Sequence, residues 1–411
     1  MESINAFLNH PDLYYYLLIP VFSGLIGWIT NAIGIQMMFS PQEFVGIRPI
    51  FGWQGIIPAK AGKFARLQME QIEKIVDINS LLDRVDPDEV AAIIQPGMRR
   101  MTEELTDEVA SQNIPFAWEN TPNFIKERLY KRMDKDFPKL FDNLYKDLRN
   151  NIDTLFDSKQ MVIEKLTNEK HILADLIHQT IDKELKFLVK SGLYLGFLFG
   201  IGQMILWYNF PDTWYVLPIG GFLVGYLTNW IAVKLMFRPI NPIKIGPFTL
   251  HGLFLKRKDE VAKDYAKTLT TSVLDAKSIA DYILRGTASD QLYKLLQRHF
   301  KAIIDSSMGI GKPLVMFSVG TENYIQMKNK LCDRITEDMR ELPQPLQEGL
   351  AYTEKAMALE SEIEVRMRNF SSLEFDGFVR PIFEQDEWIL YAVGGALGFV
   401  AGWCQLITMF S

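Results

Sequence analysis

Two stretches of the chain, 18–41 and 216–239, share one pattern of apolar, small and polar residues. A shift of 198 residues aligns LIPVFSGLIGWITNAIGIQMMFSP with VLPIGGFLVGYLTNWIAVKLMFRP. The alignment matches a proline, a glycine, a Thr-Asn pair and a Phe-x-Pro ending, and apolar composition alone would not place these at one spacing. We therefore interpret the stretches as an internal duplication. A repeat of this kind indicates an architecture built from two similar units, whatever the local secondary-structure signals are.

Four apolar runs are long enough to cross a bilayer, because about 20 helical residues suffice. They cover 14–39, 187–207, 214–237 and 388–410. The sequence predicts an all-α polytopic membrane protein with four transmembrane helices in two parallel repeats, each with a cytoplasmic amphipathic helical domain. The predicted domains are a first transmembrane helix at 1–41, a cytoplasmic helical domain at 42–186, a transmembrane hairpin at 187–237, a second cytoplasmic helical domain at 238–387 and a last transmembrane helix at 388–411.

Basic residues are distributed unevenly around the predicted spans. The ends of the two long polar segments carry many Lys and Arg residues, whereas residues 1–12, the 208–213 turn and the carboxyl end carry none. Lys and Arg are enriched in the cytoplasmic loops of membrane proteins. The positive-inside rule therefore predicts that both long segments are cytoplasmic and that both termini lie outside.

The polar segments show helical periodicity, with leucines and isoleucines at three- and four-residue steps through 173–188. No Pro or Gly interrupts 159–191, so one unbroken helix is expected from 158 to 207, whereas Pro96-Gly97 is expected to end a helix. Glycines and prolines in 43–60 exclude a regular helix directly after the first span. They predict turns with a short extended pair, repeated after the third span.

A polar pair lies inside each duplicated span: Thr30 and Asn31 in the first, Thr228 and Asn229 in the second. An asparagine within a bilayer is costly unless its amide has a partner, so these pairs are expected to face the interior of the bundle. Two interpretations remain open. The pairs either lock helices together through interhelical hydrogen bonds or line a path for a small solute or ion.

The amphipathic helices also allow two interpretations. They either pack face to face as an ordinary helical domain or leave an apolar groove that shields acyl chains at the membrane. In the second case, basic residues near the bilayer would contact anionic headgroups, and the candidates are Lys60, Lys256, Arg257 and Lys258. Membrane lipid is therefore the expected partner, while protein partners and homo-oligomerisation stay open.

No residue pattern in the sequence indicates catalysis or a bound cofactor. The five histidines lack metal-ligand spacing, and SSMGIGKP at 306–313 lacks the residues of a phosphate-binding loop. The formal net charge of -6, without an extended basic stripe, argues against nucleic acid. The two cysteines fall in a polar region and in a span, so no disulfide is expected. We expect a protein without enzyme activity, metal or cofactor.

The duplicated motif also resembles a known family. The resemblance is carried by Gly27, Trp28, Thr30, Asn31, Met38, Phe39, Pro41, the stretch from Gly55 to Lys60 and the carboxyl end from Gly394 to Trp403. Together these resemble the YheB-like bacterial membrane proteins, an uncharacterised family with a domain of unknown function. The second copy departs from the pattern at Leu255, where the first has Pro58. The resemblance implies an integral membrane protein and supplies no established activity.

The leading hypothesis is a non-enzymatic, multi-pass protein of the bacterial cytoplasmic (inner) membrane that organises the envelope or binds lipid at the cytoplasmic face. It rests on duplicated spans joined to long amphipathic helices without a catalytic cluster. The alternative is a small-solute or ion transporter that uses the Thr-Asn pairs. A third hypothesis is a cytoplasmic scaffold for a protein partner.

Overall fold

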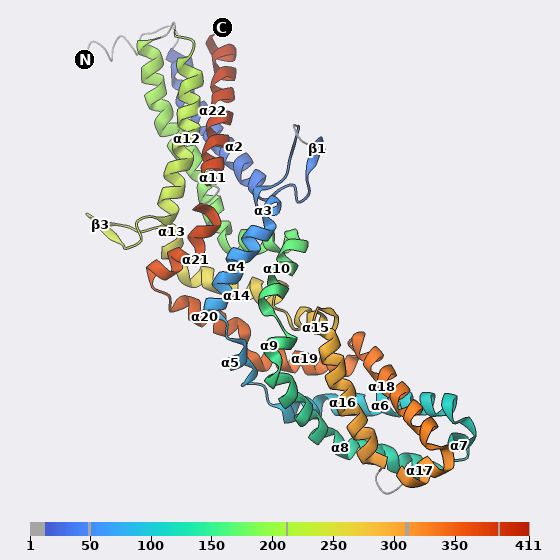
Figure 1. The fold of residues 1–411 in the computed structure, drawn as a ribbon. Coiled ribbons are helices and arrows are strands. Elements are labelled where there is room, and N and C mark those ends of the chain that lie inside the picture. The colour runs from blue at the N-terminus through green and yellow to red at the C-terminus, as the bar shows by residue number, and fades with distance from the viewer. Residues whose placement is uncertain (1–12, 48–50, 211–212, 309–311, 385–386, 411) are drawn as a thin grey trace. The chain divides into compact units, whose positions relative to one another are not determined.

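The computed structural model describes residues 13–47, 51–210, 213–308, 312–384 and 387–410. Helices make up nearly all of the regular structure in these ranges, and the strands there form two short hairpins (Figure 1). The predicted all-α class is therefore confirmed. The beginning of the predicted 1–41 domain and part of the 208–213 turn lie outside the described residues.

The chain divides into two compact units, and each unit combines parts of both long polar segments. Unit 1 consists of 1–75, 163–269 and 363–411, and unit 2 consists of 76–162 and 270–362. The units are defined by contacts within the fold and do not begin or end at the ends of the spans. They therefore do not test the domain limits drawn from the sequence, which stay predictions.

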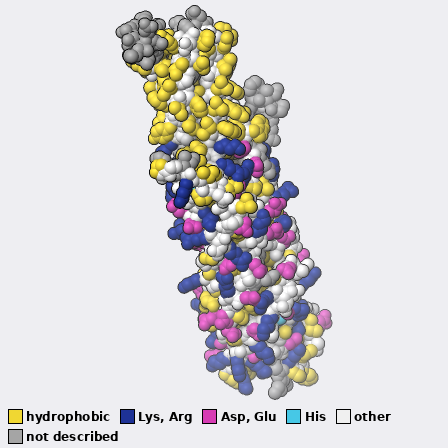
Figure 2. All heavy atoms as spheres, turned by 90° about the vertical axis from the view of Figure 1, so that its left-hand side faces the viewer, with side chains coloured by type: hydrophobic (Ala, Val, Ile, Leu, Met, Phe, Trp, Pro, Cys, Tyr) yellow, Lys and Arg dark blue, Asp and Glu magenta, His cyan; other side chains and the backbone are white. Residues whose placement is uncertain are grey.

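Among its described residues, unit 1 contains four helices that are long and apolar enough to cross a membrane. They are α2 (Leu13–Phe39), α11 (Lys170–Asn209), α12 (Val216–Phe237) and α22 (Glu387–Phe410). Large apolar side chains such as Leu25, Leu198 and Phe222 are exposed on them, and hydrophobic atoms cover this part of the surface in Figure 2. A continuous apolar surface of this kind suits lipid rather than water. The prediction of four transmembrane helices is confirmed.

The bundle is built from two closely packed helix pairs, α2 with α11 and α12 with α22. In the first pair Gly27 faces Gly192, and a Cβ atom added to Gly27 would lie 2.3 Å from the Gly192 carbonyl oxygen. In the second pair a Cβ on Gly225 would lie 2.1 Å from the Gly394 carbonyl oxygen. Small residues permit this approach of two backbones. The glycines of these spans therefore pack helix directly against helix.

The helix that enters the second span is shorter than the sequence predicts. Instead of one helix from 158 to 207, α10 (Ser158–Asn168) ends before α11 begins. Glu169 between them has φ -104° and ψ 69°, outside the helical region. Leu166 on α10 and Leu173 on α11 are both fully buried. The break lets each helix bury its own apolar face, and tertiary packing thus overrides the local helical preference.

A short antiparallel hairpin follows each of α2 and α12. The hairpins consist of β1 (Val45–Ile47) with β2 (Phe51–Trp53), and β3 (Ile243–Ile245) with β4 (Phe248–Leu250). The backbone N–H of Gly55 donates to the Pro41 carbonyl at 2.9 Å, and that of Gly252 donates to Pro239 at 3.0 Å. These bonds close both hairpins in the same way. The extended pair predicted after each of these spans is confirmed.

The remaining helices of unit 1 lie at the hairpin end of the bundle (Figure 1). They are α3 (Ile56–Ala59), α4 (Ala61–Ile75), α13 (Leu253–Lys256), α21 (Ser372–Glu384), most of α14 (Lys258–Ser272) and the end of α20 (Leu359–Arg368). The hydroxyl of Tyr265 on α14 donates to Gln68 Oε1 on α4 at 2.9 Å. The Tyr265 ring also meets Phe378 of α21 edge-on, with centroids 5.1 Å apart. Tyr265 thereby joins three helices from distant parts of the sequence.

Unit 2 is a helical domain with its own apolar core. Its helices are α5 (Ile78–Leu82), α6 (Pro87–Asn113), α7 (Pro115–Glu119), α8 (Asn123–Asn150), α9 (Ile152–Leu155), α15 (Ala276–Arg285), α16 (Ser289–Met308), α17 (Lys312–Val319), α18 (Thr321–Arg340) and α19 (Gln344–Met357). Asp86 caps α6 because its carboxylate accepts the N–H of Asp88 at 2.9 Å, and Pro87 occupies the first turn. This is the helix start that the Asp-Pro pair indicates.

The expected helix end at Pro96 is wrong, because α6 continues through it. A proline costs an internal helix one backbone hydrogen bond, so packing must compensate. Here α19 crosses α6, and a Cβ on Gly97 would lie 2.2 Å from Pro345 Cγ. The lack of a side chain at Gly97 thus lets α19 pack directly against α6 next to Pro96.

Candidate functional site

Asn31 lies at the contact between α2 and α11 and is completely buried. Its side-chain amide nitrogen (Nδ2) donates to the backbone carbonyl of Leu188 at 2.8 Å. The neighbouring Thr30 hydroxyl donates instead to the Gly27 carbonyl of its own helix at 3.2 Å. Asn31 therefore joins two helices, whereas Thr30 satisfies its polar group within one.

Asn229 and Thr228 have the same surroundings in the other helix pair. The Asn229 amide donates to the Leu390 carbonyl at 3.0 Å, and the Thr228 hydroxyl donates to Gly225 at 3.3 Å. A shift of 202 residues in the sequence places Leu188 on Leu390. Each predicted Thr-Asn pair is thus bonded within its own helix pair rather than to the other Thr-Asn pair.

The amide oxygens (Oδ1) of Asn31 and Asn229 are buried and have no hydrogen-bond partner among the described residues. A buried acceptor without a partner costs about 1–3 kcal/mol in proteins, so such atoms are rare. Each helix pair therefore combines a locking amide with one free acceptor. The acceptor has no exposed surface, so water or a solute would reach it only if the two helices moved apart.

A second buried polar contact was not identified from the sequence, although a glutamine inside an apolar run is itself a signal. The Ser23 hydroxyl donates to Gln203 Oε1 at 3.0 Å, and Gln203 Nε2 donates to the Leu217 carbonyl at 3.1 Å. Gln203 thereby links α2, α11 and α12. Gln405 lies 202 residues after Gln203 and corresponds to it in the sequence. The residue that corresponds to Ser23 is Gly221, which has no hydroxyl to donate. The Nε2 of Gln405 has no partner among the described residues. The two halves of the bundle differ at this position.

An open groove of about 430 Å³ lies at the hairpin end of α2, beside the first turns of α11. It is lined by Ala32, Ile35, Gln36, Phe39, Ser40, Gln42, Ala174, Asp175 and His178. The Phe39 and His178 rings meet edge-on with centroids 5.0 Å apart. Gln42 Oε1 is buried and has no partner among the described residues. The groove has the volume of a ligand site and combines apolar residues of a span with polar residues outside it.

Arg257, a predicted headgroup contact, is instead enclosed by acidic side chains. It donates to Glu184, whose side chain is only 1% exposed, and its Nε donates to Glu260 at 3.0 Å. Lys183 also binds Glu260, at 2.6 Å. Although desolvation opposes the charge, Glu184 and Glu260 raise the pKa of Arg257 above its ordinary value. The arrangement fixes the junction of α13 and α14 to α11 by an ion pair whose acidic partner is buried.

The other predicted headgroup contacts differ in exposure. Lys258 is partly buried, and its ammonium donates to the Phe370 carbonyl at 2.7 Å. Lys60 is also partly buried, whereas Lys256 is exposed. Of these lysines, Lys256 is the one whose side chain is open to a headgroup.

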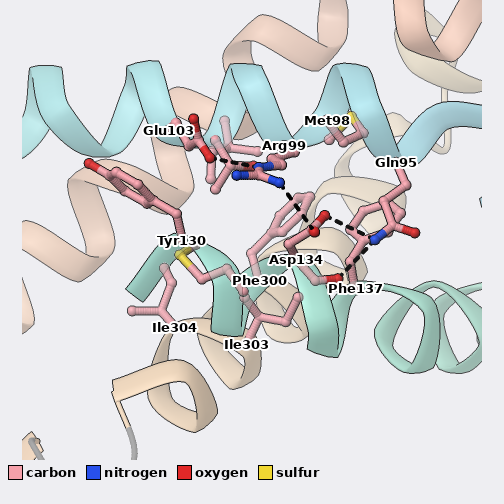
Figure 3. A pocket seen from close by; sticks show the side chains of 13 residues that line it. Gln95, Met98, Arg99, Glu103, Tyr130, Asp134, Phe137, Phe300, Ile303 and Ile304 are labelled. Carbon is pink, nitrogen blue, oxygen red and sulfur yellow. Dashed lines mark hydrogen bonds and ion pairs between the residues drawn. The ribbon is translucent and has the colours of Figure 1, made fainter. Parts of the chain in front are cut away.

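A pocket in unit 2 is lined by residues of α6, α8, α16 and α18 (Figure 3). Its cavity measures about 40 Å³, which is room for a few water molecules rather than an organic ligand. Arg99 at its rim donates to Glu103 at 2.8 Å and lies 3.7 Å from Asp134, and Gln95 also donates to Asp134 at 2.9 Å. These polar groups are already paired, so the pocket resembles a packing defect more than a binding site.

Comparison with known proteins identifies relatives of the chain. A family model described as a protein of unknown function (DUF445) matches residues 219–342. A UPF0754 membrane protein of Bacillus velezensis is 28% identical over 31% of this chain and 34% of its own length. Similar proteins of Microcystis aeruginosa and Bacillus cereus are 38% and 27% identical over 17% and 41% of this chain, and over 18% and 44% of their own lengths. The chain is related to an uncharacterised family of bacterial membrane proteins.

The resemblance of the chain to the YheB-like family is thereby confirmed. The chain spans less than half the length of these UPF0754 relatives. The DUF445 match covers Asn229 of α12 and Arg257, which follows α13. No solved structure matches the chain. The names of the UPF0754 relatives describe membrane proteins and state no activity.

Proposed function

We propose that this chain is a non-enzymatic, multi-pass protein of the bacterial inner membrane that binds lipid at the cytoplasmic face. The observation that carries the proposal is the open groove at the hairpin end of α2. It begins among residues of a membrane-spanning helix and ends among polar side chains. A phospholipid has the same division between acyl chain and headgroup.

The proposed topology has both termini outside and the long polar segments in the cytoplasm. It is supported by the basic residues at the ends of those segments. This topology places the hairpin end of α2, and therefore the groove, at the cytoplasmic interface. The two halves of the bundle are proposed to be copies of one duplicated unit, and the matching contacts of Asn31 and Asn229 support this.

The groove offers distinct groups to the two parts of a lipid. Ala32 and Ile35 would contact an acyl chain where it leaves the bilayer. Asp175 and His178 would face the headgroup and could bind its amine or hydroxyl groups. Specific lipid recognition needs this combination of apolar lining and a few placed polar groups.

The proposal is tested by filling the groove. The full-length chain is released from nanodiscs and its retained lipid is measured by native mass spectrometry. We expect Ala32→Trp to retain about one lipid per chain fewer than the unaltered protein, because the indole occupies the groove. Leu198→Trp is the matched control, since Leu198 is 60% exposed on the bundle surface and lies outside the groove. Equal retention by Ala32→Trp and the unaltered chain would exclude the groove.

Transport of a small solute or ion is the alternative, and the free acceptors of Asn31 and Asn229 favour it. The tight contacts between glycines count against an open passage through either helix pair. The test is flux of K⁺ or protons into proteoliposomes. Flux that is lost in Asn31→Ala/Asn229→Ala without a change in folding would support transport and displace the lipid proposal.

Organisation of the envelope through a protein partner is a further alternative, and unit 2 would supply the binding surface. Phe116, Phe124 and Phe317 are 83%, 70% and 92% exposed on its helices. Cross-linking of the full-length chain in its native membrane would detect such a partner. A partner lost on Phe116→Ser/Phe317→Ser would favour this alternative.

A further inference from the structure

A run of buried aromatic rings joins the end of α12 to α21. Phe237 stacks on Phe254 with centroids 5.8 Å apart, and Phe254 lies against Phe375 at 5.9 Å. All three rings are buried, and Phe254 and Phe375 are almost completely so. The residues that follow the two outer rings, Arg238 and Asp376, are thereby brought to one place.

Asp376 is held between two arginines. Its side chain is 7% exposed, Arg380 Nη1 lies 3.8 Å from its Oδ2, and the charge of Arg238 acts on it as well. Burial raises the pKa of the Asp376 carboxyl, although both arginines lower it. Its Oδ1 has no hydrogen-bond partner among the described residues. Asp376 therefore pairs with Arg380 and acts on Arg238 only through its charge, so one carboxylate faces two guanidinium groups.

A third cation lies one helical turn before Arg238. Lys234 is exposed on α12, and the backbone N–H of Arg238 donates to its carbonyl at 2.8 Å. Two acidic groups lie near this set besides Asp376. The carboxylate of Glu384 lies 3.2 Å from Arg380 Nη2, and Glu387 lines a small cavity together with Val233 and Phe237. Lys234 and Arg238 have no ion-pair partner among the described residues, so their charges remain available to an anion where α12 leaves the apolar part of the bundle.

The first half of the bundle carries different residues at the corresponding positions. The shift of 198 residues, which aligns the first and third spans, places Gln36 on Lys234 and Ser40 on Arg238. The shift of 202 residues, which aligns Leu188 with Leu390, places His178 on Arg380. Gln36, Ser40 and His178 all line the open groove. At these three positions the second half therefore carries basic side chains, whereas the first half has residues of a groove that also contains the acidic Asp175.

We propose that Lys234, Arg238 and Arg380 bind the phosphate of an anionic phospholipid headgroup. A planar guanidinium can pair with two phosphate oxygens, and a lysine ammonium adds a third charge-assisted contact. A lipid phosphate is favoured over a free one because Lys234 belongs to a membrane-spanning helix and reaches headgroup depth by extending its stem. Asp376 acts as a positioning residue for the arginines. The inference rests on the proposed lipid function but uses other residues than the groove.

The test replaces the three cations by the residues of the first half. The full-length chain is placed in nanodiscs of phosphatidylglycerol and phosphatidylcholine in equal amounts, and retained lipids are counted by native mass spectrometry. The unaltered chain is expected to prefer phosphatidylglycerol. Lys234→Gln/Arg238→Ser/Arg380→His is expected to reduce that preference about tenfold or more, because charge-assisted bonds are lost. An unchanged preference would overturn the site.

Two further variants separate the site from general charge and from misfolding. Lys190→Gln/Lys244→Gln/Lys263→Gln removes the same charge from exposed lysines of unit 1 and is expected to keep the preference. If this control variant also loses the preference for phosphatidylglycerol, overall surface charge explains the preference and the inference is overturned. Lys234→Gln alone changes an exposed side chain, so it is expected to weaken retention with an unchanged unfolding temperature. Unweakened retention in that variant counts against the site.

The source of the phosphate and independence from the groove are tested in the same system. Inorganic phosphate added to phosphatidylcholine nanodiscs is expected to leave the unfolding temperature unchanged, whereas phosphatidylglycerol raises it. Stabilisation by inorganic phosphate alone would overturn the lipid assignment in favour of a soluble anion. Ala32→Trp is expected to keep the phosphatidylglycerol preference even if it loses the lipid of the groove. If Ala32→Trp loses the preference for phosphatidylglycerol, the anionic lipid binds in the groove and not at Lys234, Arg238 and Arg380.

Discussion

Gly27 and Gly192 meet so closely that a Cβ atom on Gly27 would lie 2.3 Å from the Gly192 carbonyl oxygen. One turn further along α2, Asn31 donates to the carbonyl of Leu188, which lies one turn before Gly192 on α11. The close backbone approach and the buried hydrogen bond therefore act on adjacent turns. Each depends on the other, because a wider helix spacing would lengthen the bond from Asn31.

Gly27→Ala is expected to lower the free energy of unfolding of the bundle by about 1–3 kcal/mol, since the added methyl forces the helices apart. Thermal unfolding in detergent, followed by tryptophan fluorescence, measures the change. Gly202→Ala in α11 is the control, because a methyl group added to Gly202 would meet no atom within 4 Å. Equal unfolding temperatures for Gly27→Ala and Gly202→Ala would contradict the packing argument.

Asn31→Ala and Asn229→Ala are each expected to cost about 1 kcal/mol, a typical value for an interhelical hydrogen bond in a membrane. The two losses should be alike because the two amides have equivalent acceptors. Thr30→Val is the control, since the Thr30 hydroxyl bonds only within its own helix. A cost for Thr30→Val as large as that for Asn31→Ala would show that the interhelical bond has no special weight.

The sequence was sufficient to predict the spans, the hairpins and the burial of Asn31. Length and hydropathy determine a span, and glycines with prolines determine a turn, so these signals are local. The acceptor of Asn31 could not be predicted in the same way. It is the backbone carbonyl of Leu188, and every residue carries such a carbonyl, so no residue type marks it.

The helix limits and the groove depended on contacts that the local sequence does not encode. α11 begins after a break at Glu169, although no proline or glycine lies there. α6 continues through Pro96, although a proline usually ends a helix. In both places packing between distant helices decides the backbone. The groove likewise needs the end of α2 beside the first turns of α11, which are more than a hundred residues away in the chain.

Arg257→Met is expected to destabilise unit 1 by about 3–5 kcal/mol, because it leaves the Glu184 carboxylate buried without its partner. Glu184→Leu/Arg257→Met should recover much of the loss, since both charges are then removed. Chemical unfolding of the two single variants and the double variant gives the coupling energy. Lys183→Met is the control, as Lys183 pairs with the exposed Glu260 and should cost at most about 1 kcal/mol. A double variant less stable than Arg257→Met would refute the buried-pair argument.

Asp305 on α16 accepts bonds from three donors in unit 2. Lys312 lies at 2.9 Å, Lys328 at 3.1 Å and the Tyr324 hydroxyl at 2.9 Å. Desolvation alone would raise its pKa, but these bonds outweigh it and hold the pKa below the ordinary value of 3.8. The carboxylate therefore stabilises the fold fully above the pKa of the unfolded chain. This contribution is lost as the pH falls through the lower pKa of the folded state.

Asp305→Asn is expected to lower the stability of unit 2 at neutral pH and to make it less sensitive to acid below about pH 4. Cys332 can report the change, because it is completely buried in unit 2 and becomes accessible to a thiol-reactive disulfide reagent when that unit unfolds. Cys404→Ser removes the second thiol from the assay. Glu354→Gln, which alters an exposed acid on α19, should label like the unaltered chain at every pH. If Asp305→Asn follows the same acid dependence as Glu354→Gln, the three donors do not stabilise the Asp305 carboxylate.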